Sequence, residues 1–445
     1  MSLPTYLDES WVYAPAATDM AKNGLGLLPN TISNYLGRGH PLLFHFTGAL
    51  WLTLFGISVL NLHILSFIIA LLLLAITFFN AKRIATNTAA VLCVLFIVLQ
   101  PIFIAQSGMF LPEMLLALMG LLCIYFYIEE KIVLFNIACT LLLFTKESGL
   151  MIPVTLGIYT VITGWKSGFK LIILKEIKYF LFPLLLISLF FITQKVMNGW
   201  FFFPEHIGWI SFAPDALLAK SVTIFSYSFI YEGRNLLTAS FFLFLILKLY
   251  RKVKFKEVII SSKYEKLLGI SLPFILFYSF FCMLNFFSPR YSLILISIFI
   301  LLSGIMINDV LKPFWLKAVF IIGFIISQYD TLNYRTNTDH NLGYIDEIKT
   351  LQDITRIATE NKWQDKIVHA DFIPETILVD PASGYVSEKE VFKNENISYC
   401  GKQDYNIYIC YDRKLEEIDC GKPGNTVLLY SISHGKSRAE IYKVL

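Results

Sequence analysis

Residues 59–79 read VLNLHILSFIIALLLLAITFF, a continuous run without Asp, Glu, Lys or Arg. A helix of about 20 apolar residues crosses the hydrocarbon core of a bilayer, which is roughly 30 Å thick. Similar runs recur along the chain, which is 56% hydrophobic and 16% charged, with a mean hydropathy of +0.62. A soluble domain has about 25% charged residues. The sequence therefore predicts a polytopic α-helical membrane protein. Its continuous runs exclude a transmembrane barrel, whose strands alternate in polarity.

Basic residues predict how these runs cross the membrane. Short loops between the runs contain Lys82, Arg83, Lys131, a lysine cluster at 166–178, the basic run 251–256, Lys312 and Lys317. The positive-inside rule places such loops in the cytoplasm. Threading the chain accordingly predicts about ten crossings with both ends outside, at 59–79, 84–105, 112–128, 131–145, 149–164, 177–194, 235–250, 267–284, 291–308 and 314–329. The net charge of +4 is small and says nothing about nucleic acid, and no nucleic-acid partner is expected.

The same threading divides the chain into three parts. Residues 1–40 are polar and form an extracytoplasmic loop, residues 41–329 form the transmembrane domain, and residues 330–445 are polar again. Strand-like and helical patterns in the last part predict a small extracytoplasmic α/β domain, large enough for its own core. A helical pattern covers 343–361, and strand-like runs occur at 367–370, 405–410 and 426–432.

Two segments of the transmembrane domain are expected at the membrane surface. Residues 41–56 (PLLFHFTGALWLTLFG) are too short to span comfortably and predict a helix in the interface. Residues 195–234 predict a large outer loop with a second interfacial helix and an aromatic belt around Trp200 and Trp209. A span at 214–231 would place the basic run 251–256 on the wrong side.

Cysteines and metal ligands give little indication of chemistry. Cys93, Cys123, Cys139 and Cys282 lie in apolar runs, where cysteine behaves as a small hydrophobe. In an extracytoplasmic tail, Cys400, Cys410 and Cys420 allow one disulfide with one thiol left over. His40, His45 and His63 are not spaced like metal ligands, so no metal site is predicted. No P-loop, Gly-rich dinucleotide turn, HExxH or GxSxG motif is present.

Charged residues at the ends of the apolar runs are the candidates for chemistry. On the threading above they share one side of the membrane with the acidic pair Asp8-Glu9, and they are Arg38, Glu113, Lys146, Glu147 and Arg290. Each has an ordinary explanation: a helix cap, a favourable helix-dipole position, a surface turn or snorkelling. Cations at the outer face, however, run against the usual inside bias. Carboxylates facing cations at one membrane surface suggest chemistry on a lipid-borne phosphate.

The order of these motifs resembles that of the GT-C superfamily of membrane glycosyltransferases. The branch that it resembles most is the protein O-mannosyltransferase and lipid A aminoarabinose transferase group, glycosyltransferase family 39 and relatives. The resemblance covers residues 6–330. Its motifs are Asp8-Glu9, Gly39-His40-Pro41-Leu42-Leu43, Glu113-Met114-Leu115-Leu116, Thr145-Lys146-Glu147-Ser148-Gly149-Leu150 and Pro289-Arg290-Tyr291.

This resemblance implies an inverting transfer of sugar from a polyprenyl-phosphate donor to a hydroxyl acceptor, outside the cytoplasm, at a bacterial inner membrane. It implies that Asp8 is the catalytic base, with Glu9 as second choice or partner. Residues implied in binding the donor phosphate and substrate are Arg38, His40, Glu113, Lys146, Glu147, Arg290 and Tyr291. No cofactor is implied, although assistance by a divalent cation stays open. A lipid, a glycan or a protein could each be the acceptor.

Two departures from the family pattern keep alternatives open. Tyr13 lies one residue later than the usual tyrosine. The family begins with a transmembrane helix before the acidic loop, whereas this sequence begins in the loop. That difference predicts a truncated start, and it keeps a catalytically inactive relative open. A transporter or flippase is the other alternative. Transporters carry ionisable residues near the midplane, often in repeated halves, and neither feature is seen here.

Overall fold

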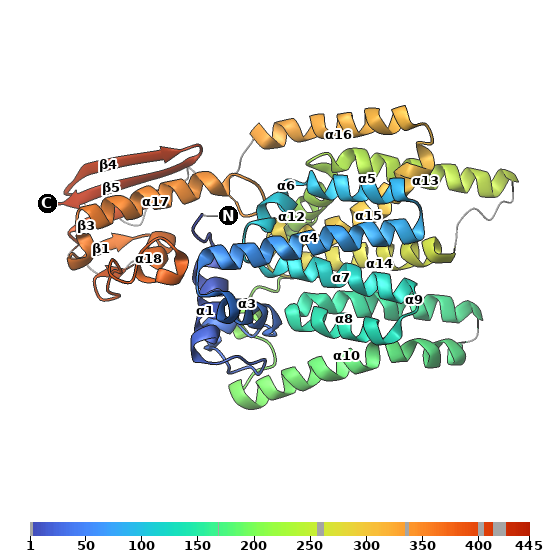
Figure 1. Ribbon diagram of the computed structural model, residues 1–445, viewed down its shortest axis with the longest axis horizontal. Helices are drawn as coiled ribbons and strands as arrows, with labels where there is room; N and C mark the ends of the chain where they lie inside the picture. The colour runs from blue at the N-terminus through green and yellow to red at the C-terminus, as the bar shows by residue number, and fades with distance from the viewer. Residues whose placement is uncertain (1–2, 168, 256–261, 334–337, 399–404, 413–423) are drawn as a thin grey trace.

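The computed structural model describes residues 3–167, 169–255, 262–333, 338–398, 405–412 and 424–445 (Figure 1). Part of the basic run 251–256 lies outside these ranges, as do Cys400 and Cys420 of the hypothesised disulfide. Long helices run side by side along the long axis of the molecule, and a small sheet domain lies at one end of this bundle (Figure 1). The helices of the bundle are α3 (Leu43–Phe55), α4 (Val59–Ile84), α5 (Asn87–Val98), α6 (Pro101–Ser107), α7 (Pro112–Ile128), α8 (Ile132–Thr145), α9 (Met151–Ser167), α10 (Phe169–Asn198), α12 (Pro214–Phe225), α13 (Arg234–Phe255), α14 (Ser262–Leu284), α15 (Leu293–Val310) and α16 (Phe314–Asn333).

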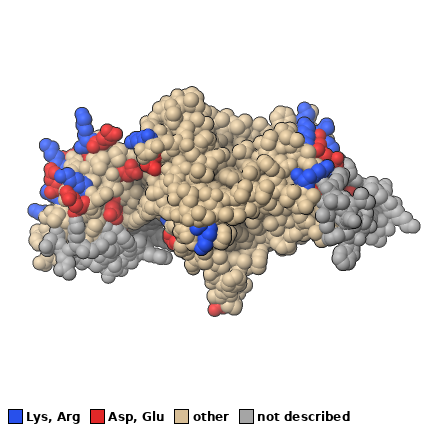
Figure 2. Space-filling view, turned by 90° about the horizontal axis from the view of Figure 1, so that it is seen from below, with Lys and Arg blue, Asp and Glu red and all other residues tan. Residues whose placement is uncertain are grey.

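The bundle has the helices of an integral membrane protein. Within the described residues, 4 helices are long and apolar enough to cross a membrane, or up to 6 if each of two bent pairs forms one span. The shorter apolar helices include α3 and α7. On the face shown in Figure 2, charged side chains gather toward the two ends, with a largely uncharged belt between them. The number of about ten crossings and their boundaries stay predictions.

One bent pair falls in the segment expected as an outer loop. Here α12 continues into a short π-helix, η3 (Ser226–Ile230), and the chain then turns by 83° into α13. Gly233 makes this turn with φ +77°, a left-handed conformation that suits glycine. The fully buried Arg234 holds the turn, because it donates from Nε to the carbonyl oxygen of Tyr227 at 2.9 Å and pairs with Glu232 at 2.7 Å.

Small side chains let the central helix α15 pack closely against its neighbours. A Cβ added at Gly304 would lie 2.5 Å from the sulfur of Cys93 on α5, and one added at Gly120 on α7 would lie 2.8 Å from Ile294. Small residues at such crossings are typical of helices packed within membranes, where close backbone approach replaces the hydrophobic effect between helices. The N-terminus of α15, and the residues just before it, are therefore held on a rigid scaffold.

The two ends of the bundle carry different charged groups. Helix α7 begins at Pro112-Glu113 and is 17 residues long, about 25 Å. At its C-terminal end, Glu129 pairs with Arg83 at 2.9 Å and also with Lys263. Basic loops therefore meet at one end of the bundle, and Glu113 lies at the other.

The N-terminal segment, expected as a polar loop, is folded into the molecule. It forms a π-helical turn, η1 (Glu9–Tyr13), and the helices α1 (Ala14–Asn23) and α2 (Asn34–Gly37). Tyr6, Val12 and Tyr13 are buried in the main core of the bundle. These apolar side chains alternate with polar ones too irregularly to show a helical period, which explains why the sequence pattern indicated a loop.

The C-terminal part is a small α/β domain, as expected. Its sheet has the order β2-β1-β3-β5-β4, with β2, β1 and β3 parallel and β5 antiparallel to both β3 and β4. The final strand, β5, was not expected from the sequence. The elements are α17 (Tyr344–Glu360), β1 (Val368–Ala370), α18 (Phe372–Val379), β2 (Ile397–Ser398), β3 (Ile407–Asp412), β4 (Thr426–His434) and β5 (Ser437–Val444).

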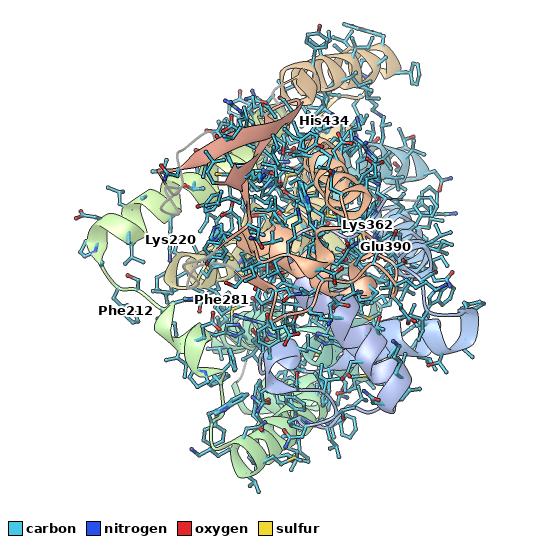
Figure 3. All side chains as sticks on the ribbon, turned by 90° about the vertical axis from the view of Figure 1, so that its left-hand side faces the viewer. Phe212, Lys220, Phe281, Lys362, Glu390 and His434 are labelled. Atoms are coloured by element: carbon cyan, nitrogen blue, oxygen red, sulfur yellow. The ribbon has the colours of Figure 1, made fainter. Side chains whose placement is uncertain are left out.

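This domain fastens the N-terminal segment to the bundle. Seen end-on from the domain's side, Lys362, Glu390 and His434 lie on the domain, while Phe212 and Lys220 lie at the edge of the bundle (Figure 3). Thr5 donates its N–H to the carbonyl oxygen of Ser383 at 3.0 Å. Tyr6 donates its hydroxyl to the buried carboxylate of Glu347 on α17. The residues that precede Asp8 are thus fixed by both parts of the molecule.

Candidate active site at one end of the bundle

A cavity of about 400 Å³ lies at the end of the bundle that faces the C-terminal domain. Four separate stretches of the chain form its walls: the N-terminal segment, the turn after α2, the short helix α11 (Pro204–Gly208), and the 3₁₀ turn η4 (Pro289–Ser292) before α15. The residues around Asp339, between α16 and α17, complete it. Cavities of this size hold small ligands in proteins.

Asp8 and Arg290 form an ion pair on the wall of this cavity. Leu7, at φ +49°, turns the chain just before Asp8, and such left-handed residues are found at functional sites. Trp11 Nε1 donates to Asp8 Oδ1 at 3.0 Å, and Arg290 Nη2 donates to Asp8 Oδ2. The Asp8 side chain is 33% exposed, whereas that of Arg290 is 4% exposed. Each carboxylate oxygen of Asp8 therefore has a donor, and part of the side chain is still open to the cavity.

The guanidinium of Arg290 is shared among three carboxylates. Besides Asp8, it binds Asp339 Oδ2 through Nη1 at 2.5 Å, and its Nε lies 3.6 Å from Glu113 Oε1. The same Glu113 oxygen accepts a hydrogen bond from Lys146 Nζ at 3.0 Å. Two cations and three carboxylates thus form one network, and a phosphate entering it would compete with carboxylates for both cations.

Burial and charge shift the pKa values of the two aspartates of this network in opposite directions. Burial raises the pKa of Asp8, but the charge and hydrogen bond of Arg290 outweigh it, so the pKa lies below its ordinary value of 3.8. At Asp339, burial dominates and raises the pKa, and Arg290 offsets it only in part. Asp8 is therefore the stronger candidate for an ionised base, since pairs of carboxyl groups with divergent pKa values often divide acid and base roles.

Glu9 does not face the cavity. Its side chain is 1% exposed and accepts hydrogen bonds from Phe110 N–H at 2.8 Å and from Tyr6 N–H at 3.2 Å. It also pairs with His63 Nε2 on α4 at 2.8 Å. These contacts connect η1 to α4 and to the start of α7, so the structure places Glu9 as an anchor behind Asp8 rather than as a second base.

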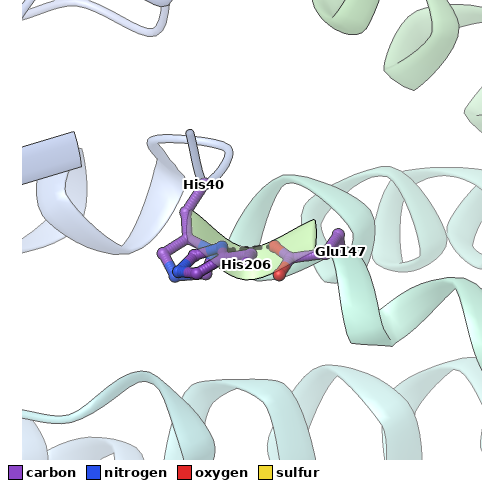
Figure 4. A group of neighbouring side chains, drawn as sticks. All are labelled: His40, Glu147 and His206. Atoms are coloured by element: carbon purple, nitrogen blue, oxygen red, sulfur yellow. Dashed lines mark hydrogen bonds and ion pairs between the residues drawn. The ribbon is translucent and has the colours of Figure 1, made fainter. Parts of the chain in front are cut away.

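A smaller cavity of about 90 Å³ lies beside the large one and is lined by Lys146, Glu147 and Tyr291. His40 and His206 line both cavities. Lys146 Nζ lies 4.0 Å from the centre of the Tyr291 ring, a cation–π contact. His40 Nδ1 lies 2.8 Å from Glu147 Oε2. The His206 ring lies beside the His40 ring, with centroids 4.9 Å apart and the planes tilted by 35° (Figure 4).

Arg38 forms the outer wall of the large cavity. It is in the left-handed region at φ +45° and pairs with Glu205 on α11 at 2.8 Å. Its guanidinium also lies 5.0 Å from the centre of the Trp11 ring. Next to it, Gly39 at φ +70° packs so closely that a Cβ there would lie 2.8 Å from Trp200. This contact joins the turn after α2 to the loop that carries α11.

The structure thus brings most of the residues implicated by sequence to one end of the bundle. Asp8, Arg38, His40, Arg290 and Tyr291 line the large cavity. Lys146 and Glu147 line the small one, and Glu113 lies behind it, bound to Lys146.

Sequence reasoning missed Asp339 and His206. Asp339 lies just beyond the last apolar run. The sequence is polar there, so a single aspartate does not stand out. His206 lies in the outer loop among aromatic residues. Neither belongs to a motif. Only their position in space shows that they share a cavity with Asp8.

Comparison with known proteins supports this architecture. No protein-family model matches the chain, and no curated protein sequence matches it. Two solved structures of ArnT from Cupriavidus metallidurans are similar to it. The one bound to undecaprenyl phosphate has a TM-score of 0.54 at 14% sequence identity, over 81% of this chain and 69% of ArnT. The apo structure has a TM-score of 0.52 at 16% identity, over 72% of this chain and 59% of ArnT. ArnT is a lipid A aminoarabinose transferase with a GT-C fold. The expected resemblance is thus confirmed for the fold: this chain has the fold of ArnT.

Proposed function

We propose that the protein is an inverting glycosyltransferase that moves a sugar from a polyprenyl-phosphate donor to a hydroxyl acceptor. The observation that carries this proposal is the pairing of the Asp8 carboxylate with the Arg290 guanidinium on the wall of the 400 Å³ cavity. That cavity lies at the end of an apolar bundle with the fold of ArnT, and ArnT has been solved with undecaprenyl phosphate bound. A base and a phosphate-binding cation are the two groups that such a transfer needs.

The proposed step is a single displacement at the anomeric carbon. The acceptor oxygen bonds to that carbon while Asp8 takes the hydroxyl proton. The bond between the carbon and the phosphate oxygen breaks, and its electron pair leaves with the polyprenyl phosphate. Arg290 and Lys146 stabilise the negative charge that develops on the leaving phosphate, because Arg290 lines the large cavity, Lys146 lines the adjoining one, and both have little exposure to water.

Donor binding would also activate the base. Asp8 and the donor phosphate compete for Arg290, so a bound phosphate takes over part of the guanidinium. The carboxylate then keeps its burial but loses some of its stabilising partner, which makes it more basic. The Trp11 N–H holds Asp8 in place during this exchange.

The charges at the two ends of the bundle support a direction for the site in the membrane. Arg83 and Lys263 meet at Glu129, at the opposite end of α7 from Glu113. Under the positive-inside rule the basic end faces the cytoplasm. The cavity and the C-terminal domain would then face the extracytoplasmic side of a bacterial inner membrane, where the acceptor is a lipid, a glycan or a protein.

The decisive variant is Asp8→Asn, which keeps the size of the side chain and removes the base. We expect sugar transfer from a labelled polyprenyl-phosphate sugar to a membrane extract to fall by about 10²–10⁴-fold. Binding of the donor lipid should remain. The matched control is Asp215→Asn, at an exposed position on α12, which should transfer at the original rate. Normal turnover by Asp8→Asn would remove the base assignment.

The same experiment separates the proposal from a transporter or flippase. A transporter would move the donor lipid between leaflets without attaching label to a hydroxyl, and Asp8→Asn would then change only the distribution of the lipid. An inactive relative would transfer no label even without the substitution.

A further inference from the structure

We propose that Asp339 couples donor binding to the uptake of a proton: its carboxylate pairs with Arg290 in the free protein, and it becomes a neutral carboxyl group when the donor phosphate binds there. This inference rests on the proposed function. Asp339 lies between α16 and α17, in the connection to the C-terminal domain. Its side chain is 6% exposed and lines the large cavity.

The contacts of Arg290 show which carboxylate a phosphate would replace. Nη2 binds Asp8, the proposed base, and Nε lies 3.6 Å from Glu113. Glu113 is 2% exposed and is also held by Lys146, so a ligand in the large cavity reaches it poorly. Nη1 binds Asp339 Oδ2 at 2.5 Å. Carboxylate and phosphate oxygens fit the same planar fork of a guanidinium. Nη1 is therefore the nitrogen that a phosphate can take without displacing the base.

The backbone around Asp339 keeps the carboxyl group within reach of a phosphate at Nη1. Gln106 on α6 is fully buried and donates from Nε2 to the carbonyl oxygen of Asp339 at 2.8 Å. Asn341 donates from Nδ2 to Thr338 Oγ1 at 3.0 Å and accepts from the N–H of Gly343 at 2.7 Å. Because the turn is held in this way, Asp339 remains beside the bound phosphate. A protonated Asp339 can donate its O–H to a phosphate oxygen, whereas an ionised one repels it.

The charges of the network favour the uptake of a proton. The cations Arg290 and Lys146 face the carboxylates of Asp8, Asp339 and Glu113, which leaves one negative charge in excess. A phosphodiester would add another in a site with little exposure to water, and like charges there disfavour ionisation. Burial raises the pKa of Asp339, the charges of Asp8 and Glu113 raise it further, and Arg290 lowers it. A phosphate that takes Nη1 weakens this one lowering contact.

Other titratable groups near Asp339 are less suited to take the proton. Burial lowers the pKa of His340, the next residue, to about 4, and that of His206 on the cavity wall to about 3. Behind His340, Glu232 and Arg234 neutralise each other in an ion pair of 2.7 Å. His40 also lines the cavity and is paired with Glu147, so it needs a variant of its own in the test.

Proton uptake can be measured on binding alone, without any assay of transfer. The probe is a short-chain polyprenyl methyl phosphate, a diester that lacks the second ionisation of a phosphate monoester near about pH 6. Its binding to full-length protein in nanodiscs would be followed by calorimetry at several pH values, in buffers of different ionisation enthalpy. We expect the affinity to rise as the pH falls between the pKa of bound and of free Asp339, by up to about 10-fold per pH unit. The heats in the different buffers should show uptake of up to one proton in that range.

Substitutions of Asp339 identify the group that takes the proton. Asp339→Asn is neutral at every pH, so its affinity should not change with pH and should exceed that of the wild type at about pH 8 by at least about 10-fold. Asp339→Glu should restore the pH dependence. If Asp339 only tied the C-terminal domain to Arg290, Asp339→Asn would instead bind more weakly than the wild type at every pH.

Two further variants exclude the neighbouring groups. His40→Gln should keep the pH dependence of the wild type. Asp8→Asn should keep it at lower pH, because Asp339 loses a negative neighbour. Thermal unfolding would show that each variant is folded.

A wild-type affinity that stays constant from about pH 5 to 8 would overturn the inference while leaving the proposed donor intact. So would a pH dependence that survives in Asp339→Asn or disappears in His40→Gln. A folded wild-type protein that does not bind the diester at all would contradict the proposed function as well.

Discussion

At the scale of single residues, Arg290 links the charged groups of the site. This side chain is almost fully buried, yet it contacts Asp8, Asp339 and Glu113. A buried cation of this kind needs carboxylate partners, because its desolvation is costly without them. The planar guanidinium can bind several oxygens at once. Arg290 can therefore pass from carboxylate to phosphate oxygens without leaving its position.

The pH dependence of Asp8 should report its contact with Arg290. In the free protein, Arg290 holds the pKa of Asp8 below 3.8, so the base stays ionised as the pH falls toward that value. In Arg290→Gln the charge is gone and burial remains, so the pKa of Asp8 rises. We expect the acid limb of kcat/KM, which reports the free enzyme, to move to higher pH. The maximal rate should also fall by about 10²–10³-fold.

Arg356→Gln is the control for this experiment, because Arg356 lies exposed on α17 of the C-terminal domain. Its profile should match that of the wild type. An acid limb that stays in place in Arg290→Gln would contradict the account of how Asp8 is kept ionised.

At the scale of elements, the site depends on how η1 is anchored. Glu9 joins this turn to His63 on α4 and to the backbone of Phe110 before α7. Thr5 and Tyr6 join the same segment to the C-terminal domain. Asp8 thus lies between two anchors on either side of it in the sequence, which fix where its carboxylate points.

Removing the inner anchor should cost stability. In Glu9→Gln, an amide NH₂ replaces one carboxylate oxygen and faces an N–H donor, and the charge beside His63 is lost. We expect the free energy of unfolding to fall by about 1–3 kcal/mol, as for other buried groups that lose a partner. Denaturation of the purified protein would measure it.

Glu388→Gln is the matched control, at an exposed position in the C-terminal domain, and should change stability by no more than about 0.5 kcal/mol. If both variants unfold alike, Glu9 does not anchor η1 as described.

Sequence patterns predicted the apolar helices well, because a long uncharged run such as 59–79 is explained by a helix that crosses the membrane. They also predicted that Asp8, in the polar segment before these runs, and Arg290, at the end of one of them, share one side of the membrane. The same patterns indicated a loop for residues 1–40, where η1 and α1 lie, since packing against the bundle and the C-terminal domain orders this segment. They gave no sign that His206 lies beside His40 and Glu147, because distance along the chain does not show which turns meet at the end of a bundle.

At the scale of the whole molecule, the architecture separates two kinds of charge. The basic groups at Glu129 lie at one end of the bundle, and the network around Arg290 lies at the other, which faces the C-terminal domain. Between them the surface in Figure 2 is largely uncharged. Such an arrangement suits a donor whose lipid tail stays in the membrane while its phosphate reaches the cavity.

The stereochemistry of the product tests the central claim most directly. Purified protein would be given a polyprenyl-phosphate sugar of known anomeric configuration together with membrane lipids of the cell that encodes it, and the product would be examined by NMR. If Asp8 acts as a base in a single displacement, the product has the inverted configuration and polyprenyl phosphate is released in equal amount. Retention of configuration would contradict the account, because it would require a covalent sugar intermediate.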